Sequence, residues 1–96
     1  MKNVKQINAN LFDKIAKYYD RGIAGKIVRK MHFRVVELIN IKNNSRILDA
    51  GCGTGDFLSI LSKNKSLKLY GIDISKEMIK ISKKKLKNKA KIQLSS

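Results

Sequence analysis

A glycine-rich loop between a strand-like and a helix-like segment constrains the fold of this chain more than any other feature. Residues 46–50 (RILDA) form a short apolar run that includes an acid, and the loop 51–55 (GCGTG) follows directly. Residues 56–62 then read as the start of a helix with apolar side chains. Glycine has no Cβ, so such a loop lets the backbone approach a ligand closely. Open α/β sheets bind ligands at the carboxyl ends of their strands, where this loop is expected to lie.

The segments after the loop continue the alternation of strand and helix. Strands are predicted over residues 67–73 and 91–94, and a helix over 76–87 with Ser75 as its N-cap. The resulting β-α-β-α-β pattern is half of an open, mostly parallel α/β sheet. Right-handed crossovers predict the strand order 3-2-1. Residues 46–96 are therefore expected to form an incomplete Rossmann-like unit.

Residues 1–45 are expected to form a helical lead-in to that unit. Spaced apolar residues predict an amphipathic helix over 5–19, and Gly25 is interpreted as part of a break before a longer helix over 25–40. The apolar stripe of the longer helix is predicted to consist of Ile27, Met31, Val35 and Leu38, with Val28 and Ile39 beside it.

The chain is strongly basic, with 22 Lys and Arg against 7 Asp and Glu in 96 residues. A net charge of +15 is typical of proteins that bind nucleic acid or anionic membranes. The charge is spread evenly, however, because the first 48 residues carry 11 basic and 3 acidic side chains and the last 48 carry 11 and 4. We interpret the densest run, residues 76–91, as a solvated helix face, with a basic patch for nucleic acid as the alternative.

Several classes of protein are excluded by the residues that are rare or missing. A single cysteine, Cys52, excludes an intramolecular disulfide and a multi-cysteine zinc site. A single histidine, His32, excludes a multi-histidine metal site, and it is interpreted as a surface or packing residue. No apolar run reaches the ~20 residues of a membrane span, and the N-terminal segment has no signal-peptide pattern. The sequence thus predicts a cytoplasmic protein without bound metal.

Two acids at strand ends indicate which ligand the loop would bind. Asp73 lies 22 residues after Gly51, where an acid accepts hydrogen bonds from ribose hydroxyls. The dinucleotide fingerprint is broken because Asp56 stands where its third glycine belongs, and the P-loop pattern is absent. An acid at that helix start would repel a pyrophosphate. A nucleoside with a cationic tail fits better, with Asp49 as the counter-charge for a ligand amine.

The segments ILDAGCGTGDF (47–57) and YGIDISKEMI (70–79) resemble the class I S-adenosylmethionine-dependent methyltransferases. The upstream FDKIAKYYD (12–20) resembles the lead-in helix of the small-molecule branch typified by ubiquinone and menaquinone biosynthesis. The resemblance implies the Rossmann-like methyltransferase fold of α/β class, truncated to its first three parallel strands. It also implies S-adenosylmethionine as cofactor. The chain is expected to be the N-terminal half of such an enzyme, completed by another chain or associating through its open sheet edge.

The resemblance implies roles for individual residues. Asp49 matches the acid that serves the methionine amino group, and Gly51 and Gly53 match glycines that bring backbone against the methionine and ribose. Asp73 matches the acid that binds both ribose hydroxyls. The alternative is that Asp73 only caps the following helix. A tight strand-to-helix turn without a ligand is the alternative for the loop as a whole.

Four further positions complete the predicted cofactor site. Ile74 and Met78 match positions that flank the adenine, although Met78 is equally consistent with a core residue. Tyr19 matches an aromatic residue near the methionine end. Cys52 lies within the loop, and its thiol is expected to serve packing rather than chemistry.

The reaction that the resemblance implies is direct methyl transfer to a small molecule. The sulfonium activates the methyl group, so the protein mainly supplies alignment and exclusion of water. No residue is assigned a catalytic role. The alternatives are a decayed methyltransferase fold that binds nucleic acid through its basic face, or a structural half completed by another chain.

Overall fold

The computed structural model describes residues 22–95, so Tyr19 and the helix predicted over 5–19 lie outside the described residues. The elements of the described part are, in order, α2 (Gly22–Leu38), β1 (Arg46–Ala50), α3 (Asp56–Leu61), β2 (Lys68–Asp73), α4 (Lys76–Leu86), the 3-10 turn η1 (Lys87–Lys89) and β3 (Lys91–Leu94).

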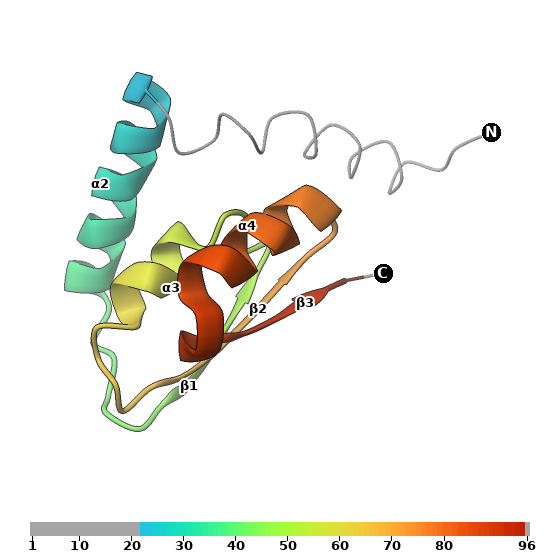
Figure 1. Cartoon of the computed structure of the whole chain (residues 1–96). Helices are drawn as coiled ribbons and strands as arrows, with labels where there is room; N and C mark the ends of the chain where they lie inside the picture. Colours follow the sequence, from blue (N-terminus) through green and yellow to red (C-terminus); the bar gives the residue numbers. More distant parts are fainter. Residues whose placement is uncertain (1–21, 96) are drawn as a thin grey trace.

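The three strands form one parallel sheet in the order β1-β2-β3, which confirms the predicted order. In the register of the sheet, Ile47 lies beside Leu69, and Gly71 lies beside Ile92. Figure 1 shows α3 and α4 on the same face of the sheet, with α2 standing beside α3. Each strand therefore delivers its carboxyl end to one edge, where the glycine loop lies.

The core fills the space between the sheet and helices α3 and α4. Leu58 of α3 and Leu86 of α4 are fully buried, and Leu69 contributes from β2. Gly71 lies in the middle of β2, where a Cβ would come within 2.8 Å of the side chains of Leu58 and Ile92. Only glycine leaves room for this close packing of helix against strand.

Helix α4 begins as the sequence predicts and ends one residue early. The hydroxyl of Ser75 accepts a hydrogen bond from the backbone N–H of Met78 at 3.2 Å, which confirms the N-cap. Lys87 has a positive φ of 52°, outside the range of the α-helix, so the helix stops at Leu86 and a 3-10 turn follows.

Helix α2 differs from the prediction in both its start and its buried face. It begins at Gly22 and runs through Gly25, because a helix tolerates an interior glycine at a cost of about 1 kcal/mol. The predicted apolar stripe faces outward, and its members are exposed: Ile27, Met31, Val35 and Leu38, with Ile39 beside them. The face turned inward instead carries Val28, His32 and Val36. A polar contact with α3, described below, accounts for this rotation.

The sheet face opposite α3 and α4 carries no helix of the described part of the chain. Leu48 of β1 points there and is 60% exposed, and it lies on the edge strand. Parallel sheets are normally covered on both faces. No helix within residues 22–95 has the length and apolar character needed to cross a membrane.

Candidate functional site

The glycine loop is held against the end of β2 by its own backbone. The N–H groups of Gly51 and Cys52 both donate to the carbonyl oxygen of Ile72, at 2.8 and 2.9 Å. Gly51, Gly53 and Gly55 have φ angles of 80°, 56° and 85°, in the left-handed region that favours glycine. The loop is thus a turn that only glycine adopts without strain at three positions.

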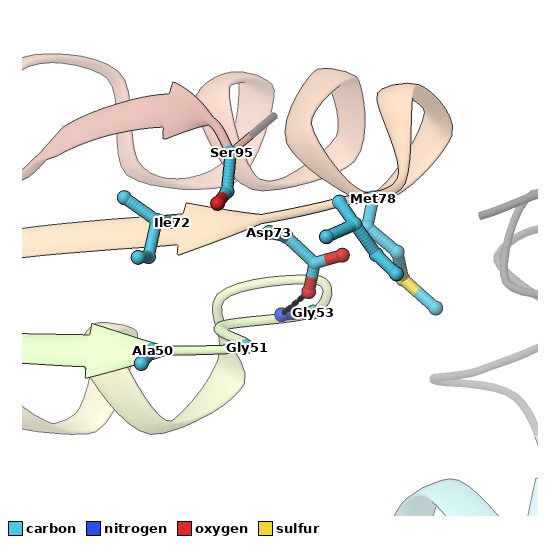
Figure 2. Close-up of a pocket in the computed structure, with 8 residues that line it drawn as sticks. Ala50, Gly51, Gly53, Ile72, Asp73, Met78 and Ser95 are labelled. Atoms are coloured by element: carbon cyan, nitrogen blue, oxygen red, sulfur yellow. Dashed lines mark hydrogen bonds between the residues drawn. The ribbon is translucent and has the colours of Figure 1, made fainter. Parts of the chain in front are cut away.

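The carboxylate of Asp73 is the polar centre of this loop (Figure 2). Its Oδ2 accepts a hydrogen bond from the backbone N–H of Gly53, and its Oδ1 accepts one from the N–H of Ser75, both at 2.9 Å. The residue is buried at 8% exposure. Each oxygen keeps a lone pair that these two bonds leave free, so the carboxylate is oriented to accept two further hydrogen bonds. Capping of the next turn and ligand binding are therefore compatible roles for Asp73.

A cavity of about 390 Å³ opens beside this carboxylate, which is within the range of small-ligand pockets. It is lined by Ala50, Gly51, Gly53, Ile72, Asp73, Ile74, Met78 and Ser95. Five of the eight predicted site residues therefore meet in one hollow: Gly51, Gly53, Asp73, Ile74 and Met78. Met78 is almost fully buried and also lines the cavity, so it serves the core and the pocket at once.

Two predicted residues lie near the cavity without lining it. Asp49 is half-buried, and its pKa lies above the usual value. Burial is the largest cause; the nearby His32 lowers the pKa, and the charge of Asp73 raises it further. The side chain of Cys52 belongs to the hydrophobic core. Burial first, and then the charges of Asp73 and Asp49, raise the pKa of the Cys52 thiol to about 11. Within residues 22–95, no group of three or more His, Cys, Asp or Glu side chains is placed to hold a metal ion.

The sequence did not predict the contribution of Ser95 to the cavity. Ser95 follows β3, and its N–H donates to the carbonyl oxygen of Asp73 at 2.7 Å. Only the pairing of β3 with β2 brings it there, so no local pattern points to it.

A second polar cluster joins α2 to the first turn of α3. The carboxylate of Asp56 is 8% exposed and accepts hydrogen bonds from Arg29 Nη1 and, at 2.9 Å, from His32 Nδ1. The His32 ring also contacts the ring of Phe57 edge-on, with 5.4 Å between centroids. The interpretation of His32 as a surface or packing residue was therefore incomplete, because it pairs with an acid 24 residues away in the chain.

Comparison with known proteins identifies the family. Residues 41–95 match the family described as "Methyltransferase domain". The chain belongs to this family. It is 40% identical over 82 residues to the demethylmenaquinone methyltransferase of Thermotoga maritima. This aligned region covers 81% of this chain and 36% of that protein. The chain spans between 27% and 39% of the length of the curated relatives it matches.

Solved structures with low sequence identity share the fold of this methyltransferase domain. The cyclase SpnF superposes with a TM-score of 0.81 at 14% identity, over 98% of this chain and 43% of that one. The structure described as a DhpI–SAH complex superposes with a TM-score of 0.75 at 17% identity, over 96% of this chain and 45% of the other. These likenesses confirm the truncated Rossmann-like α/β fold, and the cyclase shows that the fold alone does not determine the reaction.

Cys52 of this methyltransferase domain is expected to be unreactive in the folded state. With a pKa of about 11, the thiol carries about a hundredfold less thiolate at pH 8 than an ordinary cysteine does, and it is also buried. Modification by a disulfide reagent such as DTNB should therefore be at least about 100-fold slower in buffer than in denaturant. Equal rates in the two solvents would contradict the buried position.

Asp56→Asn is expected to destabilise the domain and to make its free energy of unfolding depend less on pH in the acid range. Burial alone would raise the pKa of Asp56, but hydrogen bonds from His32 and Arg29, with the charges of Arg29 and Lys85, hold it below its usual value. A carboxyl group whose pKa is lower in the folded than in the unfolded state stabilises the fold. This stabilisation is fully present above the pKa of the unfolded state and is lost as the pH falls through the pKa of the folded state.

The size of this effect follows from two charge-assisted hydrogen bonds, discounted because Arg29 is half-exposed. We expect a loss of about 2 kcal/mol at pH 7 and a clearly smaller loss at about pH 3. Urea unfolding at both pH values measures the difference. The same loss at both would mean that the charge of Asp56 is not what stabilises the contact.

Proposed function

We propose that this domain supplies the cofactor-binding site of an S-adenosylmethionine-dependent methyltransferase. The observation that carries the proposal is the Asp73 carboxylate, which two backbone N–H groups orient at the mouth of a ligand-sized hollow. Its two remaining lone pairs suit the two adjacent hydroxyls of a ribose. No basic side chain lines the hollow among the described residues, which favours a nucleoside without phosphates.

The other lining residues fit the rest of that ligand. Ile74 and Met78 offer an apolar surface suited to one face of a flat base such as adenine. Gly51 and Gly53 would let the backbone approach the ribose and the methionine portion, because a Cβ at either position points into open space of the kind a ligand fills. Asp49 stands close enough to Asp73 for their charges to interact, and it supplies the negative potential that attracts the ligand's ammonium.

When bound, S-adenosylmethionine supplies a methyl group activated by its sulfonium. The residues of this chain bind and orient: Asp73 fixes the ribose, and the glycine loop fixes the direction in which the methyl group points. We assign no proton-transfer role to any of these residues. The described part of the chain therefore acts by alignment.

We propose a small molecule as the methyl acceptor. The support is that several relatives, from Thermotoga maritima to Bacillus subtilis, are named demethylmenaquinone methyltransferases. We further propose that additional polypeptide covers the exposed face around Leu48 and helps to form the acceptor pocket. The exposed apolar face of a parallel sheet supports this second step.

Isothermal titration of the purified chain with S-adenosylhomocysteine tests the cofactor site. We expect saturable binding with one site per chain and competition by adenosine. NAD serves as the control, because no basic side chain of residues 22–95 lines the hollow to pair with its pyrophosphate. Binding of NAD in place of S-adenosylhomocysteine, or no binding by a folded chain, would contradict the proposal.

A further inference from the structure

We propose that helix α2 is a docking surface for an anionic lipid membrane, which it contacts through its outward apolar stripe and an adjoining row of basic side chains. The inference goes beyond the cofactor site, because none of the residues that line the cofactor cavity lies on α2. The two proposals can therefore fail independently of each other.

The outward stripe of α2 is a continuous apolar ridge rather than a set of scattered side chains. Its members recur at spacings of four, four and three residues along about three helical turns: Ile27, Met31, Val35 and Leu38. Leu38 is 70% exposed, Met31 60% and Ile27 53%. Single exposed apolar side chains are ordinary, whereas a contiguous apolar face marks an interaction site.

The ridge faces outward because polar contacts occupy the other side of α2. Among the described elements, α2 packs mainly against α3, beside which it stands in Figure 1. There Arg29 and His32 pair with the buried carboxylate of Asp56. Turning the ridge toward α3 would break this pairing and leave a buried charge without a partner, which is strongly unfavourable. The fold of the described residues thus presents the ridge to a partner outside the domain.

A row of cations accompanies the ridge along its length. Lys26, Lys30 and Arg34 recur at every fourth position, are exposed, and each directly precedes a member of the ridge. Successive residues lie about 100° apart around a helix, so this row runs along one rim of the ridge. Glu37 is the single acid against four basic residues in α2, and it pairs with Arg34 at 3.1 Å. The charge beside the ridge is therefore strongly positive.

An anionic bilayer is the partner that this combination fits. Interfacial helices bury an apolar side at the boundary between headgroups and acyl chains, and their Lys and Arg residues contact anionic headgroups. Lysine can follow an apolar surface with its aliphatic stem while its ammonium stays in the polar layer. A bilayer needs no complementary groove, so it suits a single convex helix with its charges along one rim. The net charge of +15 adds attraction at longer range.

Co-sedimentation of the full chain with vesicles of phosphatidylcholine and phosphatidylglycerol in equal amounts tests the proposal. We expect binding that is at least about tenfold weaker to phosphatidylcholine alone. Met31→Gln combined with Leu38→Gln keeps the charge and should weaken binding at least about tenfold, because less apolar surface is buried. Leu48→Gln is the matched control: Leu48 is as exposed as Met31, at 60%, but lies on the open sheet face. Its binding should stay within about twofold of the wild type.

A second pair of variants separates the rim of α2 from the basic charge of the whole chain. Lys30→Gln should weaken binding about fivefold, as expected for one lysine held at an anionic surface. Lys84→Gln removes the same charge from the exposed face of α4 and should change binding by less than about twofold. Equal losses in the two variants would mean that overall charge, and not α2, attracts the vesicles, and would overturn the proposal.

Fluorescence locates the contact directly, because the chain contains no tryptophan. In Met31→Trp, the emission should shift to the blue on anionic vesicles and be quenched by brominated lipid, whereas Leu48→Trp should show neither effect. A folded chain that does not bind anionic vesicles, or that binds them equally well without the ridge, would overturn the proposal. So would a dimer in sedimentation that dissociates in the variant with Met31→Gln and Leu38→Gln, because a second copy would then cover the ridge.

Discussion

Asp73→Ala is expected to weaken the binding of S-adenosylhomocysteine by at least about 100-fold. The substitution removes the charged acceptor of the two hydrogen bonds that the ribose hydroxyls would donate, each worth about 1.5–3 kcal/mol. It also leaves the N–H groups of Gly53 and Ser75 without the acceptor that orients the loop. Isothermal titration measures the loss.

Two controls separate ligand contact from folding. Glu37→Gln removes a carboxylate from the exposed face of α2 and should leave the affinity within about twofold, because screening weakens distant surface charges. Asp73→Asn keeps one acceptor oxygen and should retain more of the native fold than Asp73→Ala. If Asp73→Ala binds as tightly as the wild type, this carboxylate does not hold the ribose.

Gly55→Ala is expected to give the largest loss of stability among substitutions in the loop. Gly55 has a φ of 85°, and a Cβ there would lie 2.8 Å from Leu86 Cδ1 and 3.1 Å from Ser82 Cβ. The left-handed conformation costs about 1 kcal/mol for alanine, and overpacking adds about 1–3 kcal/mol. We expect a total of about 3 kcal/mol, which is a large part of the stability of a domain of this size.

Gly51→Ala is the matched control for the steric part of that loss. Gly51 has a similar φ of 80°, but a Cβ there meets no atom within 4 Å. Its free energy of unfolding should fall by only about 1 kcal/mol. Urea unfolding followed by far-UV circular dichroism gives both values, and equal losses would show that Leu86 and Ser82 do not confine Gly55.

The strands and the glycine loop could be predicted because their signals are local. Short apolar runs such as Ile47-Leu48, followed by glycines and then a helical pattern, specify a parallel unit whatever surrounds them. The bonds of Asp73 to Gly53 and Ser75 likewise involve the two strand ends that the topology places side by side. The sequence therefore predicted that Asp73 and the glycine loop lie together at the carboxyl ends of the strands.

The rotation of α2 could not be predicted, because its cause is not local. Apolar periodicity favoured burial of the face that carries Met31 and Val35, whereas the pairing of Arg29 and His32 with Asp56 turns the opposite face inward. Nothing in the spacing of these residues indicates which acid they reach.

Asp49 and Cys52, the two described site predictions that lie outside the cavity lining, illustrate the same limit at the scale of single side chains. Asp49 and Ala50 point to opposite faces of β1, and it is Ala50 that lines the hollow. Cys52 turns into the core, where its Sγ would lie 3.0 Å from a Cβ at Gly71. The motif placed Asp49 near the end of the strand and Cys52 in the loop, but only the packed sheet determines where each side chain points.

The most direct test of the cofactor site is a titration of the ¹⁵N-labelled chain with S-adenosylhomocysteine, followed by amide chemical shifts. We expect saturable shifts for the amides of Gly51, Gly53 and Ser75, which lie in the cavity wall or bond to Asp73. The amides of Lys83 and Lys84, on the exposed face of α4, should stay unchanged. A folded chain whose loop amides do not move, or whose shifts are confined to the basic face of α4, would contradict a cofactor site at the glycine loop.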